Sequence, residues 1–278
     1  MSVNTNDLLI FLHVPKTAGS TFHQILNARY RASKTHNVFG SRYSEESIAE
    51  FMRDGSTKYT GVELLKGHMP FGLHSYASHS KSRYITILRN PIERVISQYY
   101  YIKKNVNNPL YDAVEGGGMS ITDFVESGVA VGMNNGQCRF LNGDLDEYAF
   151  NECDEQLLNQ VKDNIEKHFV WVGLTERFDE SVLLLADLMK WKKLPFYFRE
   201  NVSKTRKPAR AISDQDIKAI QHYNKYDLEL YEYAGKRLDA QIANSPEFSR
   251  RLSAFVLKNQ RLQKRWGRVP HWLREPFL

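Results

Sequence analysis

The sequence predicts an α/β fold of three layers, in which a mainly parallel central sheet is flanked by helices. Short, largely apolar runs occur at Leu8–Val14, Tyr84–Leu88 and Phe169–Leu174, and segments with helical spacing alternate with them. Runs that are apolar throughout are typical of strands covered on both faces. The 278 residues are enough to bury a sizeable core. We therefore expect a single domain, with an α/β core at 7–210 and a helical C-terminal region at 211–278.

The first half of the chain supplies two strands of the expected sheet and the helices that follow them. Residues 7–14 predict a buried strand and residues 20–30 a helix. The mixed polar segment after them contains a short helix at Glu45–Arg53. The second run, Tyr84–Leu88, is β-branched and ends before Pro91, which is suited to the first turn of a helix at Ile92–Lys103.

The second half is mainly helical and contributes the third strand. The segment Asn105–Met119, with its proline and three consecutive glycines, predicts a loop that is the best candidate for a mobile segment. Ser213 and Asp216 have the spacing of a capping box and start a long helix that runs to about Ala234 or beyond. The other helices are expected at Ile121–Gly128, Asp154–Phe169, Glu180–Trp191 and 248–268, the last of them basic.

Composition excludes several classes of protein. The chain is 42% hydrophobic and 25% charged, as in ordinary soluble domains, and its net charge of +6 is mild. Two cysteines, Cys138 and Cys153, exclude a disulfide scaffold; one disulfide is possible, but we expect two free thiols, and no Cys/His cluster has the spacing of a zinc site. The N-terminal segment has no basic region, and Leu8–Val14 is too short to span a membrane. We expect a cytoplasmic protein that binds no nucleic acid, with peripheral membrane contact and oligomeric state left open.

The first candidate site is Pro15–Phe22, which directly follows the first apolar run. The first N–H groups of a helix lack intrahelical partners and lie at the positive end of its dipole, so a hydroxyl-rich turn between strand and helix is typical of a phosphate-binding loop. Lys16 adds a cation, and Gly19 allows close approach of the backbone to a ligand. The residues expected to bind phosphate in this P-loop-like turn are Lys16, Thr17, Ala18, Gly19, Ser20 and Thr21.

The order of residues in this loop differs from that of common ATPases. Their loop has a lysine directly after its last glycine, whereas here Lys16 precedes the only glycine. A second anion site is predicted at Arg89, because ligands bind at the carboxyl ends of parallel strands and a guanidinium gives paired hydrogen bonds to phosphate. Ser97, eight residues later in the next helix, adds a donor. Arg89 and the first loop would then face the same crevice.

Three segments resemble the Golgi-type carbohydrate sulfotransferases, a group that includes the heparan sulfate 2-O-sulfotransferases and many bacterial relatives. Pro15–Phe22 is similar to their PKTAGT/S loop, and Leu88–Tyr100 to their R-[DN]-P-x-x-R-x-x-S-x-Y motif. Leu65–His74 resembles the segment that supplies the catalytic histidine in the 2-O branch. Asn134–Arg139 and Trp171–Phe178 also resemble family segments. We leave the role of the first open and expect Glu176 in the second to be structural.

The resemblance implies a sulfotransferase that uses 3′-phosphoadenosine 5′-phosphosulfate (PAPS) without a metal. The loop would bind the 5′-phosphosulfate, and Arg89 and Ser97 the 3′-phosphate. Lys16 would stabilise the leaving phosphate, and His68 would be the general base toward a hydroxyl of the acceptor, with a glycan or glycolipid favoured. Ser203, Lys204 and Thr205 are expected to contact PAPS. Other candidates for the base are Glu63, His74 and His13, the last of which we expect to orient the loop.

Two further functions stay open at this point. A nucleotide-binding protein or small-molecule kinase with a variant phosphate loop would bind ATP with Mg²⁺, yet the G-K-[ST] order and a nearby magnesium carboxylate are not evident in the sequence. A polyanion-binding protein would use the basic region at 248–278. The sulfotransferase interpretation is favoured because it accounts for both anion sites together.

Overall fold

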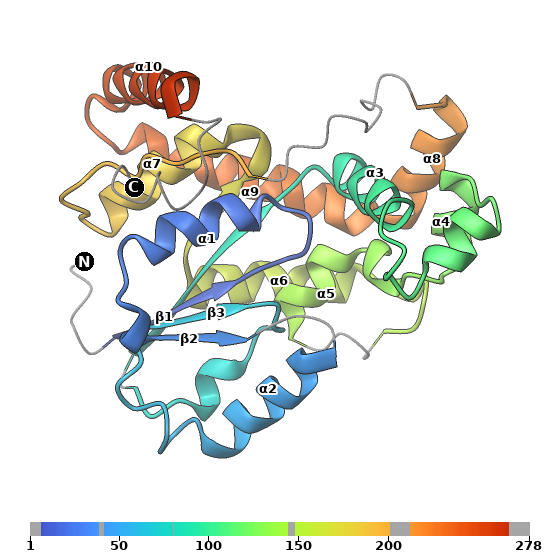
Figure 1. The fold of residues 1–278 in the computed structure, drawn as a ribbon, viewed down its shortest axis with the longest axis horizontal. Helices are drawn as coiled ribbons and strands as arrows, with labels where there is room; N and C mark the ends of the chain where they lie inside the picture. The colour runs from blue at the N-terminus through green and yellow to red at the C-terminus, as the bar shows by residue number, and fades with distance from the viewer. Residues whose placement is uncertain (1–6, 39–41, 80, 144–147, 201–211, 267–278) are drawn as a thin grey trace.

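The central element is a five-stranded sheet in the order β2-β3-β1-β4-β5 in which every adjacent pair is parallel (Figure 1). The computed structural model describes residues 7–38, 42–79, 81–143, 148–200 and 212–266. The strands are β1 (Asp7–Leu12), β2 (Thr35–Val38), β3 (Leu64–Gly67), β4 (Lys81–Leu88) and β5 (Phe169–Leu174). From β1 the chain goes to one side of the sheet, and from β3 it crosses to the other. The switch point therefore lies at the carboxyl end of β1, where ligands bind in such sheets.

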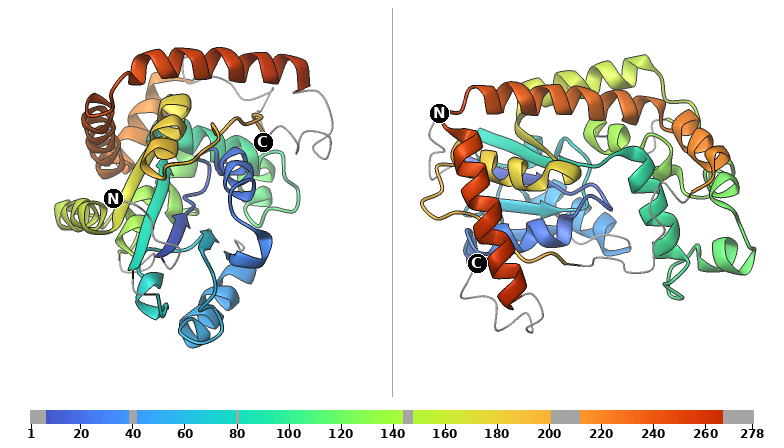
Figure 2. Two further views of the ribbon diagram at one scale, coloured as in Figure 1. Left: turned by 90° about the vertical axis from the view of Figure 1, so that its left-hand side faces the viewer. Right: turned by 90° about the horizontal axis from the view of Figure 1, so that it is seen from above.

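Helices cover both faces of this sheet, as a three-layer fold requires. On one face, α1 (Gly19–Asn27) packs Phe22 against Phe11 of β1 and Trp171 of β5, and Trp171 also hydrogen-bonds to α7 (Phe178–Leu188). On the other face, α6 (Glu155–His168) packs against β4 and β5. The helix α10 (Phe248–Trp266) lies across α7 as an outer element (Figure 2).

The remaining helices extend the fold at the edges of the sheet. The helix α2 (Arg42–Asp54) lies beside β2, and the long α9 (Lys225–Ala243) contacts β5. A second hydrophobic cluster joins α3 (Pro91–Ile102), α4 (Ile121–Glu126) and α8 (Asp214–Tyr223) at one end of the molecule (Figure 1). The short α5 (Gly136–Asn142) packs on α6 and α9. The C-terminal helices thus pack on the α/β core.

The predicted fold class is confirmed, and so are the three predicted strands. Two strands, β2 and β3, and the helix α5 were not predicted. The single long helix expected after Ser213 is wrong, because it divides at Asn224 into α8 and α9. The segment expected to be a loop at Asn105–Met119 contains a π-helical turn, η3 (Asp112–Gly116).

Cys138 and Cys153 are both free thiols. Within the part of the chain that the structure describes, none of the helices is both long enough and apolar enough to cross a membrane.

Candidate functional site

Three neighbouring strands end at the candidate site. Residues 13–18 follow β1, His68 follows β3, and Arg89 follows β4, and these strands are adjacent in the sheet. Parallel strands present their carboxyl ends at one edge, so Lys16, His68 and Arg89 are brought together from distant parts of the sequence. Glu63, by contrast, precedes β3 and lies at the opposite edge, where its carboxylate is 3.9 Å from Lys34 Nζ.

The loop that follows β1, residues 13–18, has an unusual backbone conformation. Lys16 and Ala18 both have positive φ angles, 72° and 65°, which are costly for residues with a Cβ and persist only where neighbours fix them. Left-handed residues in alternation turn successive N–H groups toward one side and form an anion-binding concavity. Ala18 is the N-cap of α1 and has no side-chain cap, so the concavity opens on the helix N-terminus.

Side chains bind three consecutive carbonyl groups of this loop. Thr17 Oγ1 donates to the Val14 carbonyl over 2.7 Å. Arg94 Nε donates to the Pro15 carbonyl over 3.2 Å, and Arg89 Nη1 to the Lys16 carbonyl over 3.0 Å. These bonds fix the carbonyl groups and with them the orientation of the peptide planes. The single hydroxyl proton of Thr17 is used here, so Thr17 can offer a ligand its backbone N–H only.

Gly19 is required by its contact with His13. A Cβ built at Gly19 would lie 1.7 Å from His13 Nε2, far inside any real contact. The sequence suggested that Gly19 allows close approach of the backbone to a ligand, and the structure adds that its missing side chain makes room for the His13 imidazole. The loop, the start of α1 and the His13 ring are therefore packed as one unit.

Three imidazole rings are packed together beside the loop. The rings of His13 and His68 are stacked with centroids 4.1 Å apart, and His23 Nε2 is 3.2 Å from His13 Nδ1. Burial lowers the pKa of His68, as does the nearby Lys16, while its bond to the His13 carbonyl acts in the opposite direction. Burial likewise lowers the pKa of His13 well below 6.5 and that of His23 to about 3, so the stack is neutral at pH 7.

The hydrogen bond of His68 determines its tautomer. His68 Nδ1 lies 2.8 Å from the backbone carbonyl of His13. A carbonyl only accepts, so Nδ1 carries the proton and Nε2 carries the free lone pair. A neutral imidazole held in this way can take a proton at Nε2. His74 is elsewhere, packed on Tyr84 and His168, and is not part of the stack.

Arg89 is held from several directions at the end of β4. Its backbone N–H and carbonyl bond to the side-chain amide of Gln137, each over 2.9 Å. Its guanidinium is 3.5 Å from Glu93 and 3.8 Å from Glu176, and its Nε is buried without a hydrogen-bond partner among the described residues. Glu176 also accepts from the Asn90 N–H and from Tyr231, so it fixes this turn to α9, in keeping with a structural role.

One face of α3 carries Glu93, Ser97 and Tyr101 at intervals of four residues. Glu93 contacts Arg89, and the Tyr101 ring lies 3.8 Å from Lys16 Nζ, centroid to ammonium. Ser97 lies between them and therefore faces the same site. Tyr101 and the buried Arg94, which also lies 3.7 Å from Asp227, were not singled out from the sequence.

The other predicted site residues have varied surroundings. Thr21 is buried and its hydroxyl oxygen accepts from the Glu200 N–H over 3.1 Å, whereas Ser20 is exposed. The predicted contacts Ser203, Lys204 and Thr205 lie outside the described residues. No cluster of three or more possible metal ligands occurs among the residues with a defined placement.

This geometry defines an α/β protein with a left-handed loop and an uncapped helix N-terminus at the switch point of its sheet, an arrangement suited to binding an anion. The profile of the galactose-3-O-sulfotransferase family matches residues 2–266, and the chain belongs to that family. The resemblance seen in the sequence is thus confirmed at the level of the family.

Individual relatives are distant. Heparan-sulfate 6-O-sulfotransferase 1 of Cricetulus griseus is 23% identical over 273 residues, covering 82% of this chain and 66% of the relative. Galactose-3-O-sulfotransferase 2 of Homo sapiens is 26% identical over 252 residues, covering 84% and 61%. The chain therefore spans less than two thirds of the length of these relatives. A solved structure of mouse sulfotransferase SULT7A1 complexed with PAP is 15% identical, covers 91% of this chain and 90% of that chain, and has a TM-score of 0.39.

Proposed function

We propose that this protein transfers a sulfuryl group from PAPS to a hydroxyl of a carbohydrate acceptor. The observation that carries the proposal is the meeting of Lys16, His68 and Arg89 at the ends of three adjacent strands. Family membership supports the reaction type. The relatives are named for heparan sulfate and galactose, which supports a sugar acceptor. The sulfuryl group of PAPS is attached to its 5′-phosphate, and the nucleotide leaves as adenosine 3′,5′-bisphosphate when the group is transferred.

The residues present fit a ligand with two anionic ends. The left-handed loop and the N-terminus of α1 would hold the 5′-phosphosulfate through the backbone of Lys16 to Thr21. Arg89, whose buried Nε lacks a hydrogen-bond partner in the described structure, would bind the 3′-phosphate together with Ser97. The Lys16 ammonium would neutralise charge that develops on the leaving phosphate. Ser203, Lys204 and Thr205 stay predicted contacts.

His68 is the proposed general base, through Nε2. Its Nδ1–H is committed to the His13 carbonyl, so the proton from the acceptor hydroxyl has one nitrogen to go to. Burial keeps the pKa of the imidazole low and the ring unprotonated at neutral pH. The ring of His13, which is stacked at 4.1 Å and packed on Gly19, holds His68 in place and acts as a positioning residue.

Variants of these residues test the proposal. Removing a general base typically costs about 10²- to 10⁴-fold in rate. We expect His68→Ala to lose turnover by that order while binding adenosine 3′,5′-bisphosphate as the wild type does. His222→Ala, at an exposed histidine of α8, is the matched control and keeps full turnover.

The same assays distinguish the roles of the two proposed cofactor-binding residues, Lys16 and Arg89. Lys16→Ala loses turnover, and Arg89→Ala weakens adenosine 3′,5′-bisphosphate without changing acceptor affinity. Tighter binding of ATP·Mg²⁺ than of adenosine 3′,5′-bisphosphate in calorimetry would contradict the proposal and favour a kinase.

The cellular location is a separate matter. A cytoplasmic location stays a prediction, and neither the fold nor the relatives support it. Fractionation of cells that express the chain, followed by immunoblotting, decides it: recovery in the soluble cytoplasmic fraction agrees with the prediction and recovery elsewhere contradicts it.

A further inference from the structure

The helix α10 is the most basic helix of the described structure. Its residues 248–266 include six lysines and arginines and no acidic residue. The apolar side of the helix is already used, because Phe248 and Phe255 are buried and α10 packs on α7. Figure 2 shows α10 on the outside of α7, so its opposite face is turned away from the sheet. This outer face is the one that a partner can contact.

Helical spacing places four residues along one line of the outer face. Arg250, Leu257, Arg261 and Lys264 follow one another at intervals of seven, four and three residues, and all four are exposed. At a rise of 1.5 Å per residue this line is about 21 Å long. Leu257 lies at its midpoint and is 50% exposed. These four residues, which we call the α10 stripe, combine positive charge with a single apolar side chain at the centre.

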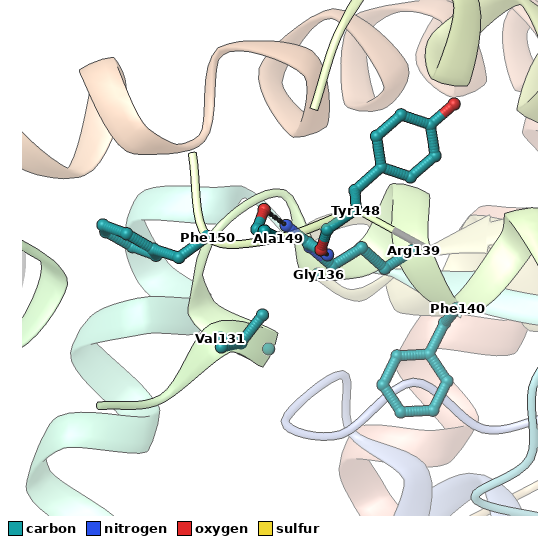
Figure 3. A pocket seen from close by; sticks show the side chains of 8 residues that line it. Val131, Gly136, Arg139, Phe140, Tyr148, Ala149 and Phe150 are labelled. Carbon is teal, nitrogen blue, oxygen red and sulfur yellow. Dashed lines mark hydrogen bonds between the residues drawn. The ribbon is translucent and has the colours of Figure 1, made fainter. Parts of the chain in front are cut away.

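A cation attracts a partner only where its charge is not already used within the protein. Figure 3 shows the opposite case beside α5, where Arg139 lies against the backbone of Tyr148 and Ala149. The guanidinium of Arg139 is bound by the carbonyl groups of these two residues, so it braces the chain and has little capacity left for a ligand.

The cations of the α10 stripe are not used in this way. The side chains of Arg261 and Lys264 form no hydrogen bond or ion pair with the described residues of the chain. Arg250 lies 2.5 Å from Glu247, and both of these side chains are exposed. An exposed pair of this kind is weak, so Arg250 can exchange its partner. The stripe therefore presents positive charge to the solvent.

A bilayer that contains acidic lipids matches both properties of the stripe. Lysine and arginine side chains are attracted to acidic headgroups, and an apolar side chain among them can enter the boundary of the acyl chains. A sulfated glycan or a nucleic acid would also attract the cations. Neither would gain from Leu257, because an apolar side chain offers a charged group no partner. The exposed leucine thus favours the bilayer.

We propose that the α10 stripe docks the protein on a bilayer that contains acidic phospholipids. The inference goes beyond the proposed reaction and does not depend on it. Docking is peripheral and reversible, because the apolar side of α10 stays packed on α7 and the attraction of each cation is modest.

Co-sedimentation of the full chain with vesicles tests the inference. The wild type should bind vesicles of phosphatidylcholine and phosphatidylserine in equal parts, and bind phosphatidylcholine alone much more weakly. Each cation near an acidic bilayer contributes about fivefold in affinity, so Arg261→Gln/Lys264→Gln should bind the mixed vesicles about 25-fold more weakly. Leu257→Gln, which keeps the size and removes the apolar surface, should bind roughly fivefold more weakly. The matched control is Lys162→Gln/Lys167→Gln, with the same loss of charge on α6 across the sheet, and it should bind as the wild type does.

Several results would overturn the inference. They are absence of wild-type binding to the mixed vesicles, equal binding to phosphatidylcholine alone, wild-type affinity in Arg261→Gln/Lys264→Gln, or an equal loss in the control. Wild-type affinity in Leu257→Gln would also overturn it, because the surface would then recognise negative charge alone and a free polyanion would be the better partner. All of the substituted stripe residues are exposed, so the variants should fold, and circular dichroism checks this. Sedimentation needs no turnover, so its result is separate from that of the sulfation assays.

Discussion

Replacing Gly19 with alanine tests whether the loop and the imidazole stack act as one unit. The new Cβ would lie 1.7 Å from His13 Nε2. Since non-bonded atoms settle at about 3.5–4.0 Å, the ring or the loop must move by roughly 2 Å. His13 also fixes His68, through the stacked ring and the 2.8 Å bond to its carbonyl. Misplacement by about 1 Å can cost 10²-fold in rate, and overpacking about 1–3 kcal/mol of stability.

We therefore expect Gly19→Ala to lower kcat about 10²-fold, which is the loss that a misplacement of about 1 Å can cause. We expect the variant to stay folded at 25 °C. Steady-state sulfation assays and urea unfolding measure the two effects. The control is Gly235→Ala in α9, where the added methyl meets only an ordinary contact at 3.9 Å. Wild-type kcat in Gly19→Ala would contradict this expectation, because it would show that the position of His68 does not depend on the packing of His13.

Other consequences of the structure can be measured directly. Arg94→Met leaves the buried Asp227 carboxylate without its cation and should lower the free energy of unfolding by about 3–5 kcal/mol, so a loss near zero in urea unfolding contradicts it. Tyr101→Leu removes the ring that Lys16 contacts before ligand binding and should tighten adenosine 3′,5′-bisphosphate by roughly 2- to 5-fold in calorimetry; weaker binding opposes this view. The pKa of His23 is lowered from 6.5 to about 3, so the unfolded state takes up more protons and stability falls as the pH drops below 6.5. Unfolding curves between pH 7 and pH 4 should show this fall, reduced in His23→Gln, and constant stability speaks against it.

The strands that the sequence predicted are the long apolar ones. β1, β4 and β5 are buried on both faces, so their composition is sufficient to identify them. β2 and β3 have four residues each, and β3 contains Lys66, which is buried and bonded to Asn27. Burial lowers the pKa of this lysine to about 8. A lysine in a short strand predicts exposure from sequence alone, and its partner lies 39 residues away.

The division between α8 and α9 depends on a distant residue as well. Asn135 Oδ1 accepts from the N–H groups of Tyr226 and Asp227 in the first turn of α9, and Asn224 accepts from the Asn135 N–H. A helix start that is capped from another segment has no local signal, so apolar spacing predicted one continuous helix.

Only the part of the site that depends on local sequence could be predicted. Arg89 directly follows β4 and Lys16 lies in the loop after β1, both apolar strands, so their position at the sheet edge follows from the sequence. The roles of His23, Arg94 and Tyr101 depend on contacts with distant residues, and periodicity gives no sign of them.

Sulfuryl transfer with His68 as the base can be followed in one turnover. The most direct measurement is a single-turnover assay in which labelled PAPS is mixed with an excess of wild type or His68→Ala and with lactose or a heparan-type oligosaccharide. We predict rapid transfer to sugar by the wild type and about 10²- to 10⁴-fold slower transfer by the variant at equal PAPS occupancy. Equal rates would show that His68 is not the base, and no transfer by the wild type to either sugar would contradict the proposed reaction.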